Sequence, residues 1–120
     1  MATWNLTDTK HHVLICNGGS CMRGDAEAVT QALRAEIREN GADRRIHTTR
    51  TRCNGRCEDA CVVIVYPEGV WYRGVTPESA KVIVREHLLE DRPVEERAVY
   101  TYGQEGLIAS GNGPAGVEKK

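Results

Sequence analysis

The sequence predicts a single α/β domain whose elements run β-α-β and then β-β-α around a mixed four-stranded sheet. Three observations carry this prediction. Apolar runs typical of strands alternate with stretches of helical periodicity, a short turn-rich segment joins two of the strands, and 120 residues suffice for one hydrophobic core. With 40% hydrophobic and 28% charged residues, the composition excludes a disordered or fibrous chain.

The first half of the chain predicts the β-α-β unit. Segment 10–16, KHHVLIC, is apolar and partly β-branched and runs into turn residues, which is typical of a buried strand ending in a loop. A helix follows from about Asp25 to Asn40, with acidic side chains in its first turn and apolar side chains at helical spacing. Segment 44–52 is rich in threonine and alternates loosely, as a strand with one wet face does. We expect these two strands to be parallel, with a right-handed connection.

The second half predicts a hairpin followed by a helix. Residues 61–66, CVVIVY, form the strongest strand pattern in the chain, and a Pro-Glu-Gly turn separates them from a second strand at 70–73. Thr76 is a candidate N-cap, and Pro77 suits the first helical position. Apolar residues at helical spacing then continue to a stop before Pro93.

Three parts of the chain are predicted. Residues 1–9 form a lead, residues 10–92 form the α/β domain, and residues 93–120 form a C-terminal arm and mobile tail. Within the last part, segment 94–110 suits one more strand or an interface arm, and the closing GNGPAGVEKK is rich in turn residues.

Charge and hydropathy exclude several kinds of partner. A formal net charge of -1 provides no general electrostatic basis for binding nucleic acid. The longest apolar run is far shorter than the roughly 20 residues that cross a bilayer, so no membrane insertion is expected. The N-terminal MATWNLTDTK lacks the apolar core of a signal peptide, and we therefore expect a cytoplasmic protein.

Five cysteines are the strongest functional signal in the sequence. They form a C-x4-C pair, Cys16 and Cys21, and a later C-x3-C-x3-C run, Cys53, Cys57 and Cys61. Because disulfides are rare in the cytoplasm, a cysteine cluster there more often binds metal or performs redox chemistry. The two pairs that follow predicted strands are expected to meet at one edge of the sheet, where sites in open α/β sheets gather. Four thiolates at one place indicate a metal centre.

The cysteine spacing leaves more than one chemistry open. The chain has no C-x-x-C, which counts against a dithiol oxidoreductase. The same absence weakens a zinc ribbon or finger without removing it. The sequence also offers no defensible set of nucleophile, base and orienting group, so no catalytic residues are predicted.

Several motifs are shared with one known family. They are the strand ending in Cys16, Gly19-Ser20-Cys21 followed by Arg23-Gly24, the run Cys53-Asn54-Gly55-Arg56-Cys57, and the hairpin VVIVYPEGVWY. Over roughly residues 10–90 the chain thereby resembles the thioredoxin-like 2Fe-2S ferredoxins, which are related to the 2Fe-2S subunit that partners the flavoprotein of respiratory NADH dehydrogenases. The resemblance implies a thioredoxin-like fold, a 2Fe-2S cluster as cofactor, and Cys16, Cys21, Cys53 and Cys57 as its ligands.

The function implied by the resemblance is that of a one-electron carrier between redox partner proteins, and not of an enzyme. A homodimer is also suggested, because members of the family are often dimers. Three alternatives stay open: a 2Fe-2S subunit of a larger NADH dehydrogenase or hydrogenase complex, a zinc-binding structural module, and a cluster-handling or regulatory protein.

The remaining polar residues carry weaker signals. Cys61 departs from the family pattern, which often has Gly-Pro where this chain has Ala60-Cys61, and we expect a buried structural thiol there. The four histidines share no common spacing, and we expect them in the core or on the surface rather than on a metal. Five arginines lie in a stretch without acidic residues and suit either a cationic surface beside the site or a solvated strand face: Arg44, Arg45, Arg50, Arg52 and Arg56.

Overall fold

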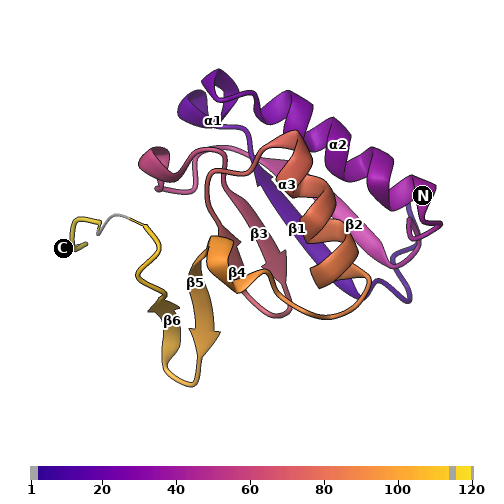
Figure 1. The fold of residues 1–120 in the computed structure, drawn as a ribbon. Helices are drawn as coiled ribbons and strands as arrows, with labels where there is room; N and C mark the ends of the chain where they lie inside the picture. The colour runs from indigo at the N-terminus through magenta and orange to yellow at the C-terminus, as the bar shows by residue number, and fades with distance from the viewer. Residues whose placement is uncertain (1–2, 114–115, 120) are drawn as a thin grey trace.

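The computed structural model describes residues 3–113 and 116–119, and its centre is a six-stranded mixed sheet with helices packed on it (Figure 1). The strands lie in the order β2-β1-β3-β4-β5-β6, with β1 and β2 parallel and the other neighbours antiparallel. The strands are β1 (His11–Cys16), β2 (Ile46–Thr51), β3 (Val63–Tyr66), β4 (Val70–Tyr72), β5 (Ala98–Gly103) and β6 (Gly106–Ala109). The helices are α1 (Gly19–Arg23), α2 (Ala26–Glu39) and α3 (Pro77–Val82), with the π-helix η2 (Ile83–Leu88) and the 3-10 turns η1 (Cys57–Asp59) and η3 (Glu95–Arg97).

The predicted β-α-β unit is present, with β1 and β2 side by side in the sheet. Alternate side chains of β1, among them Val13 and Ile15, are fully buried. The apolar stripe of α2 is also buried, and Figure 1 shows α2 beside α3. The structure adds α1, a short helix in the segment after β1 that the sequence indicates only as a loop. Its five residues include one buried side chain, Cys21, so no apolar periodicity marks it.

The predicted hairpin and helix are present as well. Val63, Ile64 and Val65 of β3 are buried on both faces of the sheet and belong to the hydrophobic core. Thr76 caps α3 through a reciprocal pair of bonds: Thr76 Oγ1 accepts from the Ser79 N–H at 3.1 Å, and Ser79 Oγ accepts from the Thr76 N–H at 2.8 Å. The helix then widens into η2, whose last residue is Leu88, so it ends before Pro93 as predicted.

The sheet has two strands more than the four predicted. β5 pairs with β4, and β6 forms the outer edge beyond it. β6 is hard to recognise in the sequence because its side chains face solvent, so burial imposes no alternation on it. Beyond β6, the Asn112 side chain donates to the Ala98 carbonyl at 2.9 Å, which fastens the start of the predicted tail; residues 114, 115 and 120 of that tail lie outside the described residues.

β1 gives the molecule two distinct ends. It begins at His11, near the β3–β4 turn, and finishes at Cys16, next to the end of β2. Each end carries a cluster of polar side chains. Among the described residues, no helix is long and apolar enough to span a membrane.

Candidate metal centre

The end of the sheet at Cys16 collects the predicted ligands. β1 ends at Cys16 and β2 ends just before Cys53, and because the strands are parallel their C-terminal ends lie at the same edge. Cys21 lies in α1, immediately after β1, and Cys57 is the first residue of η1. A small pocket at this edge is lined by Cys16, Gly18, Ser20, Cys21, Cys53 and Arg56.

Cys16 is buried and surrounded by hydrogen-bond donors. Burial alone would raise the pKa of its thiol. Hydrogen bonds from the backbone N–H of Gly18, from the Cys21 side chain, and from the backbone and side chain of Asn54 outweigh burial and lower the pKa of Cys16 below its ordinary value. The surroundings of this sulfur therefore favour a thiolate.

Cys21 has the opposite electrostatic character. Burial raises its pKa to about 12; the neighbouring Cys16 and Cys61 raise it too, while the Val62 backbone N–H opposes them. Metal binding by Cys21 therefore requires release of a proton, and binding and deprotonation are coupled.

Cys53 is exposed, and backbone groups shape its surroundings. The N–H of Gly55 donates to Cys53 Sγ at 3.3 Å, and Gly55 has a φ of 82°, in the left-handed region that favours glycine. A Cβ on Gly18 would lie 2.8 Å from the Cα of Cys53. The loop after β1 and the loop after β2 can approach this closely only because residue 18 has no side chain.

Cys61 makes the contacts of a structural thiol. It is buried, and its Sγ–H reaches the carbonyl oxygens of Gly24 at 3.1 Å and Cys21 at 3.3 Å. Burial raises its pKa, and the charge of Asp25 adds to that effect. Cys61 thus links the segment just before β3 to the α1–α2 junction through its hydrogen bonds.

A buried ion-pair cluster lies beside the pocket. The Asp59 side chain is fully buried, and its carboxylate accepts from Arg56 Nε at 2.6 Å and from Arg73 Nε at 3.0 Å. The Arg56 guanidinium also lies 5.1 Å from the ring centroid of Tyr100. These contacts hold a positive charge at the pocket wall, where it can offset negative charge on a metal centre.

The predicted arginine stretch is divided among different surroundings. Arg56 lines the pocket, whereas Arg50 pairs with Glu27 on α2 and Arg44 pairs with Asp8 at 3.4 Å.

Asn54 and Asp59 are two residues of the site that the sequence analysis did not predict. The Asn54-Gly55 dipeptide signals a turn but not a donor to Cys16, and a buried aspartate three residues after an arginine resembles an ordinary surface pair in sequence.

The arrangement fits a thiolate-ligated metal group. Soft sulfur ligands select zinc or iron–sulfur centres. The N–H groups directed at Cys16 and Cys53 suit an anionic group, because donors near sulfur stabilise added negative charge. The absence of a side chain on Gly18 lets the two loops that carry these cysteines come together.

Comparisons with known proteins point to one family. The family model for the thioredoxin-like 2Fe-2S ferredoxin matches residues 5–88. A protein of Priestia megaterium that bears the name of a 2Fe-2S ferredoxin is 50% identical over 121 residues, covering 99% of this chain and 94% of its own. A 2Fe-2S ferredoxin of Aquifex aeolicus is 34% identical over 100 residues, covering 73% of this chain and 87% of its own. The structure of a thioredoxin-like 2Fe-2S ferredoxin from Aquifex aeolicus has a TM-score of 0.75 to this chain at 31% identity, covering 83% of this chain and 99% of the other.

Proposed function

The chain belongs to the thioredoxin-like 2Fe-2S ferredoxin family, and from this premise we propose that Cys16, Cys21, Cys53 and Cys57 hold its 2Fe-2S cluster. The relatives are 2Fe-2S ferredoxins, and the protein is accordingly a 2Fe-2S electron carrier. The observation that carries the ligand assignment is the pocket at the C-terminal ends of β1 and β2, whose walls include Cys16, Cys21 and Cys53.

The groups around the pocket stabilise the negative charge of the bound cluster. When bound, the cluster takes up one electron and returns it. The N–H groups of Gly18, Asn54 and Gly55 stabilise negative charge on the sulfurs of Cys16 and Cys53. Arg56, fixed by Asp59, supplies a cation at the pocket wall.

Cys53 and Cys21 divide the centre into an outer and an inner side. Cys53 is exposed, so the outer side is the natural point for electrons to enter and leave. Cys21 is buried, so the inner side is shielded from water.

The experiment that tests the assignment starts from anaerobic purification. We expect a coloured protein with two irons and two acid-labile sulfides per chain and a spin-half signal after one-electron reduction, as a single 2Fe-2S cluster requires. A colourless protein holding one zinc and no sulfide, even after anaerobic reconstitution, would overturn the assignment in favour of the zinc-binding structural module.

The remaining features of the proposed function follow from the carrier role. Ferredoxins exchange electrons with redox partner proteins, and members of the family are carriers rather than catalysts. We propose that this chain likewise acts on no substrate of its own and works in the cytoplasm. We also propose that residues 10–92 form the cluster-binding domain, with 1–9 as a lead and 93–120 as an arm.

A homodimer formed through β6 completes the proposal. β6 is a sheet edge, and an edge strand presents unpaired backbone groups to a second strand. Tyr102, Leu107 and Ile108 next to this edge are exposed, Ile108 by 57%. We expect sedimentation equilibrium to give a dimer that Ile108→Lys converts to a monomer, whereas Val117→Lys leaves the dimer intact. A monomeric wild-type chain would contradict the dimer, and stable co-purification with other subunits would favour the larger complex.

A further inference from the structure

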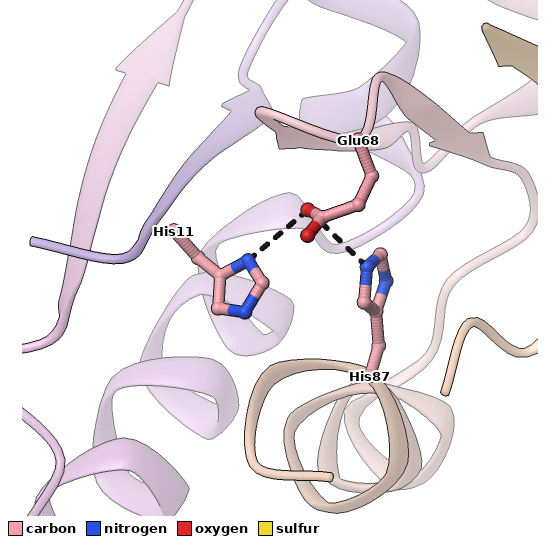
Figure 2. Close-up of side chains that lie close together, drawn as sticks. All are labelled: His11, Glu68 and His87. Atoms are coloured by element: carbon pink, nitrogen blue, oxygen red, sulfur yellow. Dashed lines mark hydrogen bonds and ion pairs between the residues drawn. The ribbon is translucent and has the colours of Figure 1, made fainter. Parts of the chain in front are cut away.

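Two buried histidines and a carboxylate converge at the end of the sheet opposite the cysteines (Figure 2). His11 begins β1, Glu68 lies in the β3–β4 turn, and His87 lies in η2. We propose that these three side chains form a binding site for a divalent cation of the zinc class, separate from the cysteine centre.

Two of the distances between the near atoms of the three side chains are close to those between metal ligands. His11 Nδ1 lies 3.1 Å from Glu68 Oε1, and His87 Nε2 lies 3.5 Å from the same oxygen. One ligand atom from each residue can be chosen so that all lie within 4.8 Å of one another. Tetrahedral zinc with bonds of about 2.0–2.2 Å separates its ligand atoms by roughly 3.3–3.6 Å. Only small side-chain movements are needed to admit the ion.

The far ring nitrogen of His11 has the partner that a metal-binding histidine normally has. His11 Nε2 lies 3.3 Å from Asp91 Oδ1, and Lys10 holds the other oxygen of Asp91 at 2.6 Å. A carboxylate on the far nitrogen orients the ring and makes the near nitrogen a better ligand. His11 is fully buried in its side chain, so its orientation is fixed by packing as well.

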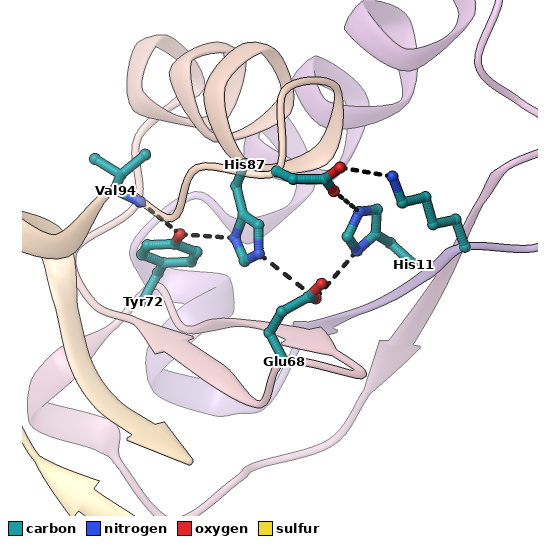
Figure 3. Close-up of polar contacts among 7 residues, drawn as sticks. His11, Glu68, Tyr72, His87 and Val94 are labelled. Atoms are coloured by element: carbon teal, nitrogen blue, oxygen red, sulfur yellow. Dashed lines mark hydrogen bonds and ion pairs between the residues drawn. The ribbon is translucent and has the colours of Figure 1, made fainter. Parts of the chain in front are cut away.

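His87 is held in the same way but with a neutral partner. Its Nδ1 lies 2.8 Å from Tyr72 Oη, which accepts from the Val94 N–H at 2.9 Å (Figure 3). The side chain is fully buried, and its Nε2, which points at Glu68, lies 3.5 Å from Glu68 Oε1 and makes no shorter hydrogen bond within the described part of the chain. A contact this long leaves a buried nitrogen poorly satisfied. A cation between His87 and Glu68 supplies a stronger partner.

Hydrogen bonds without a metal ion account for these contacts less well than a bound cation does. Both nitrogens of His11 face carboxylates, so without a metal the ring would have to donate from both, and His87 Nε2 would have only its 3.5 Å contact with Glu68 Oε1. A cation bound by the near nitrogens leaves the far nitrogen of His11 to donate to Asp91 and that of His87 to donate to Tyr72, so all four ring nitrogens have partners.

η2, which carries His87, is a π-helix, an uncommon element that often occurs at functional sites.

The ligand types select the class of ion. Two imidazole nitrogens with one carboxylate suit zinc, whereas magnesium and calcium prefer sites made of oxygen. Glu68 is about one-third exposed, so the ion can enter from that side, and three protein ligands leave a fourth position for water.

The test is calorimetric titration of zinc chloride into the full-length protein, with iron and sulfide counted beforehand so that the cysteine centre is accounted for. We expect one zinc to bind per chain. Glu68→Gln and His87→Ala should each weaken binding at least 100-fold, and Asp91→Asn about 10-fold through the orientation of His11. The double variant His12→Gln/His47→Gln is the matched control, because these two rings lie 5.2 Å apart outside the cluster, and it should bind as the wild type does.

Two readouts keep the result decisive. The visible spectrum of the cluster reports whether each variant is folded and loaded, and Glu68→Gln tests the site without opening the core even if His87→Ala does not fold. The proposal is overturned by a wild-type chain that binds no zinc, by normal binding in Glu68→Gln, or by loss of binding in the His12/His47 control. Zinc that is lost in Cys53→Ala but retained in Glu68→Gln belongs to the cysteine end and also overturns it.

Discussion

The two ends of β1 are built from different parts of the chain. At the cysteine end, the candidate ligands come from loops and short helices, Cys53 is exposed, and backbone N–H groups surround the sulfurs. At the histidine end, His11 and His87 come from a strand and a helix, are fully buried, and are held by other side chains. Hydrogen bonds lower the pKa of Cys16 against burial, whereas burial itself lowers the pKa of His87 and Glu68 opposes it.

This difference shows how each kind of site is encoded. A site made by loop backbone depends on glycines that allow close approach, and its ligands fall close together in the sequence within each loop. A site made by side chains on regular elements depends on the fold, and its members are far apart in the sequence: His11 and Glu68 are separated by 57 positions. The first kind is sensitive to backbone changes, and the second to changes of side chain.

The largest expected effect is loss of the cluster when one ligand is removed from the cysteine end. Cys57→Ala and Cys53→Ala should abolish the visible spectrum and the bound iron and sulfide, because one iron then lacks a thiolate. Alanine is the appropriate change, since a serine oxygen can itself ligate iron. Cys61→Ala is the matched control and should keep both irons. A cluster that survives Cys57→Ala but not Cys61→Ala would contradict the ligand assignment.

The second prediction concerns the buried charge beside the cysteine pocket. Asp59→Ala leaves Arg56 and Arg73 without their shared carboxylate, which should lower the free energy of unfolding by about 3 kcal/mol. Urea unfolding measures the change. Asp8→Ala, which removes an exposed partner of Arg44, should cost less than about 1 kcal/mol. Equal effects of the two changes would show that Asp59 is not paired as described.

The adjacent residues Gly18 and Gly19 allow a sharper test of how the loops at the cysteine end come together. Gly18→Ala should destabilise the protein by about 1–3 kcal/mol and reduce cluster content, because its Cβ would overlap the backbone of Cys53. Gly19→Ala should be neutral or slightly stabilising, since the nearest atom to its Cβ is the mobile end of Arg23 at 3.4 Å and alanine favours helix. Indistinguishable unfolding curves for the two variants would remove the argument for close approach of the loops.

The smallest effect is expected at the cap of α3, because this helix carries none of the cysteine ligands. Thr76→Ala should lower the free energy of unfolding by about 1 kcal/mol, because it removes the bond to the Ser79 N–H, while Thr76→Ser should preserve it. Cluster content should be unchanged in both. A loss of iron in Thr76→Ala would mean that the cap also positions the cysteine end.

Much of the fold could be predicted from the sequence, because β1, α2, β2, the hairpin and α3 each carry their own periodicity, cap or turn. α1 could not, since only Cys21 of its five residues is buried, and β6 could not, since solvent on its exposed side imposes no pattern. The cysteine spacing identified candidate ligands, but the donors from Asn54 and the buried Asp59 depend on how the loops fold. The three-residue cluster at the other end was not foreseen, because its members share no sequence spacing.

The position of β2 at the sheet edge has a consequence for folding. Among the described strands only β1 pairs with it, and the pair is parallel and connected by a long crossover, so forming its contacts carries a high cost in loop entropy. A group joining Cys16 to Cys53 would close that crossover covalently at the point where the two strands end. The cluster would then act as a cross-link as well as a redox centre, and without it β2 should be the strand that exchanges its amide hydrogens first.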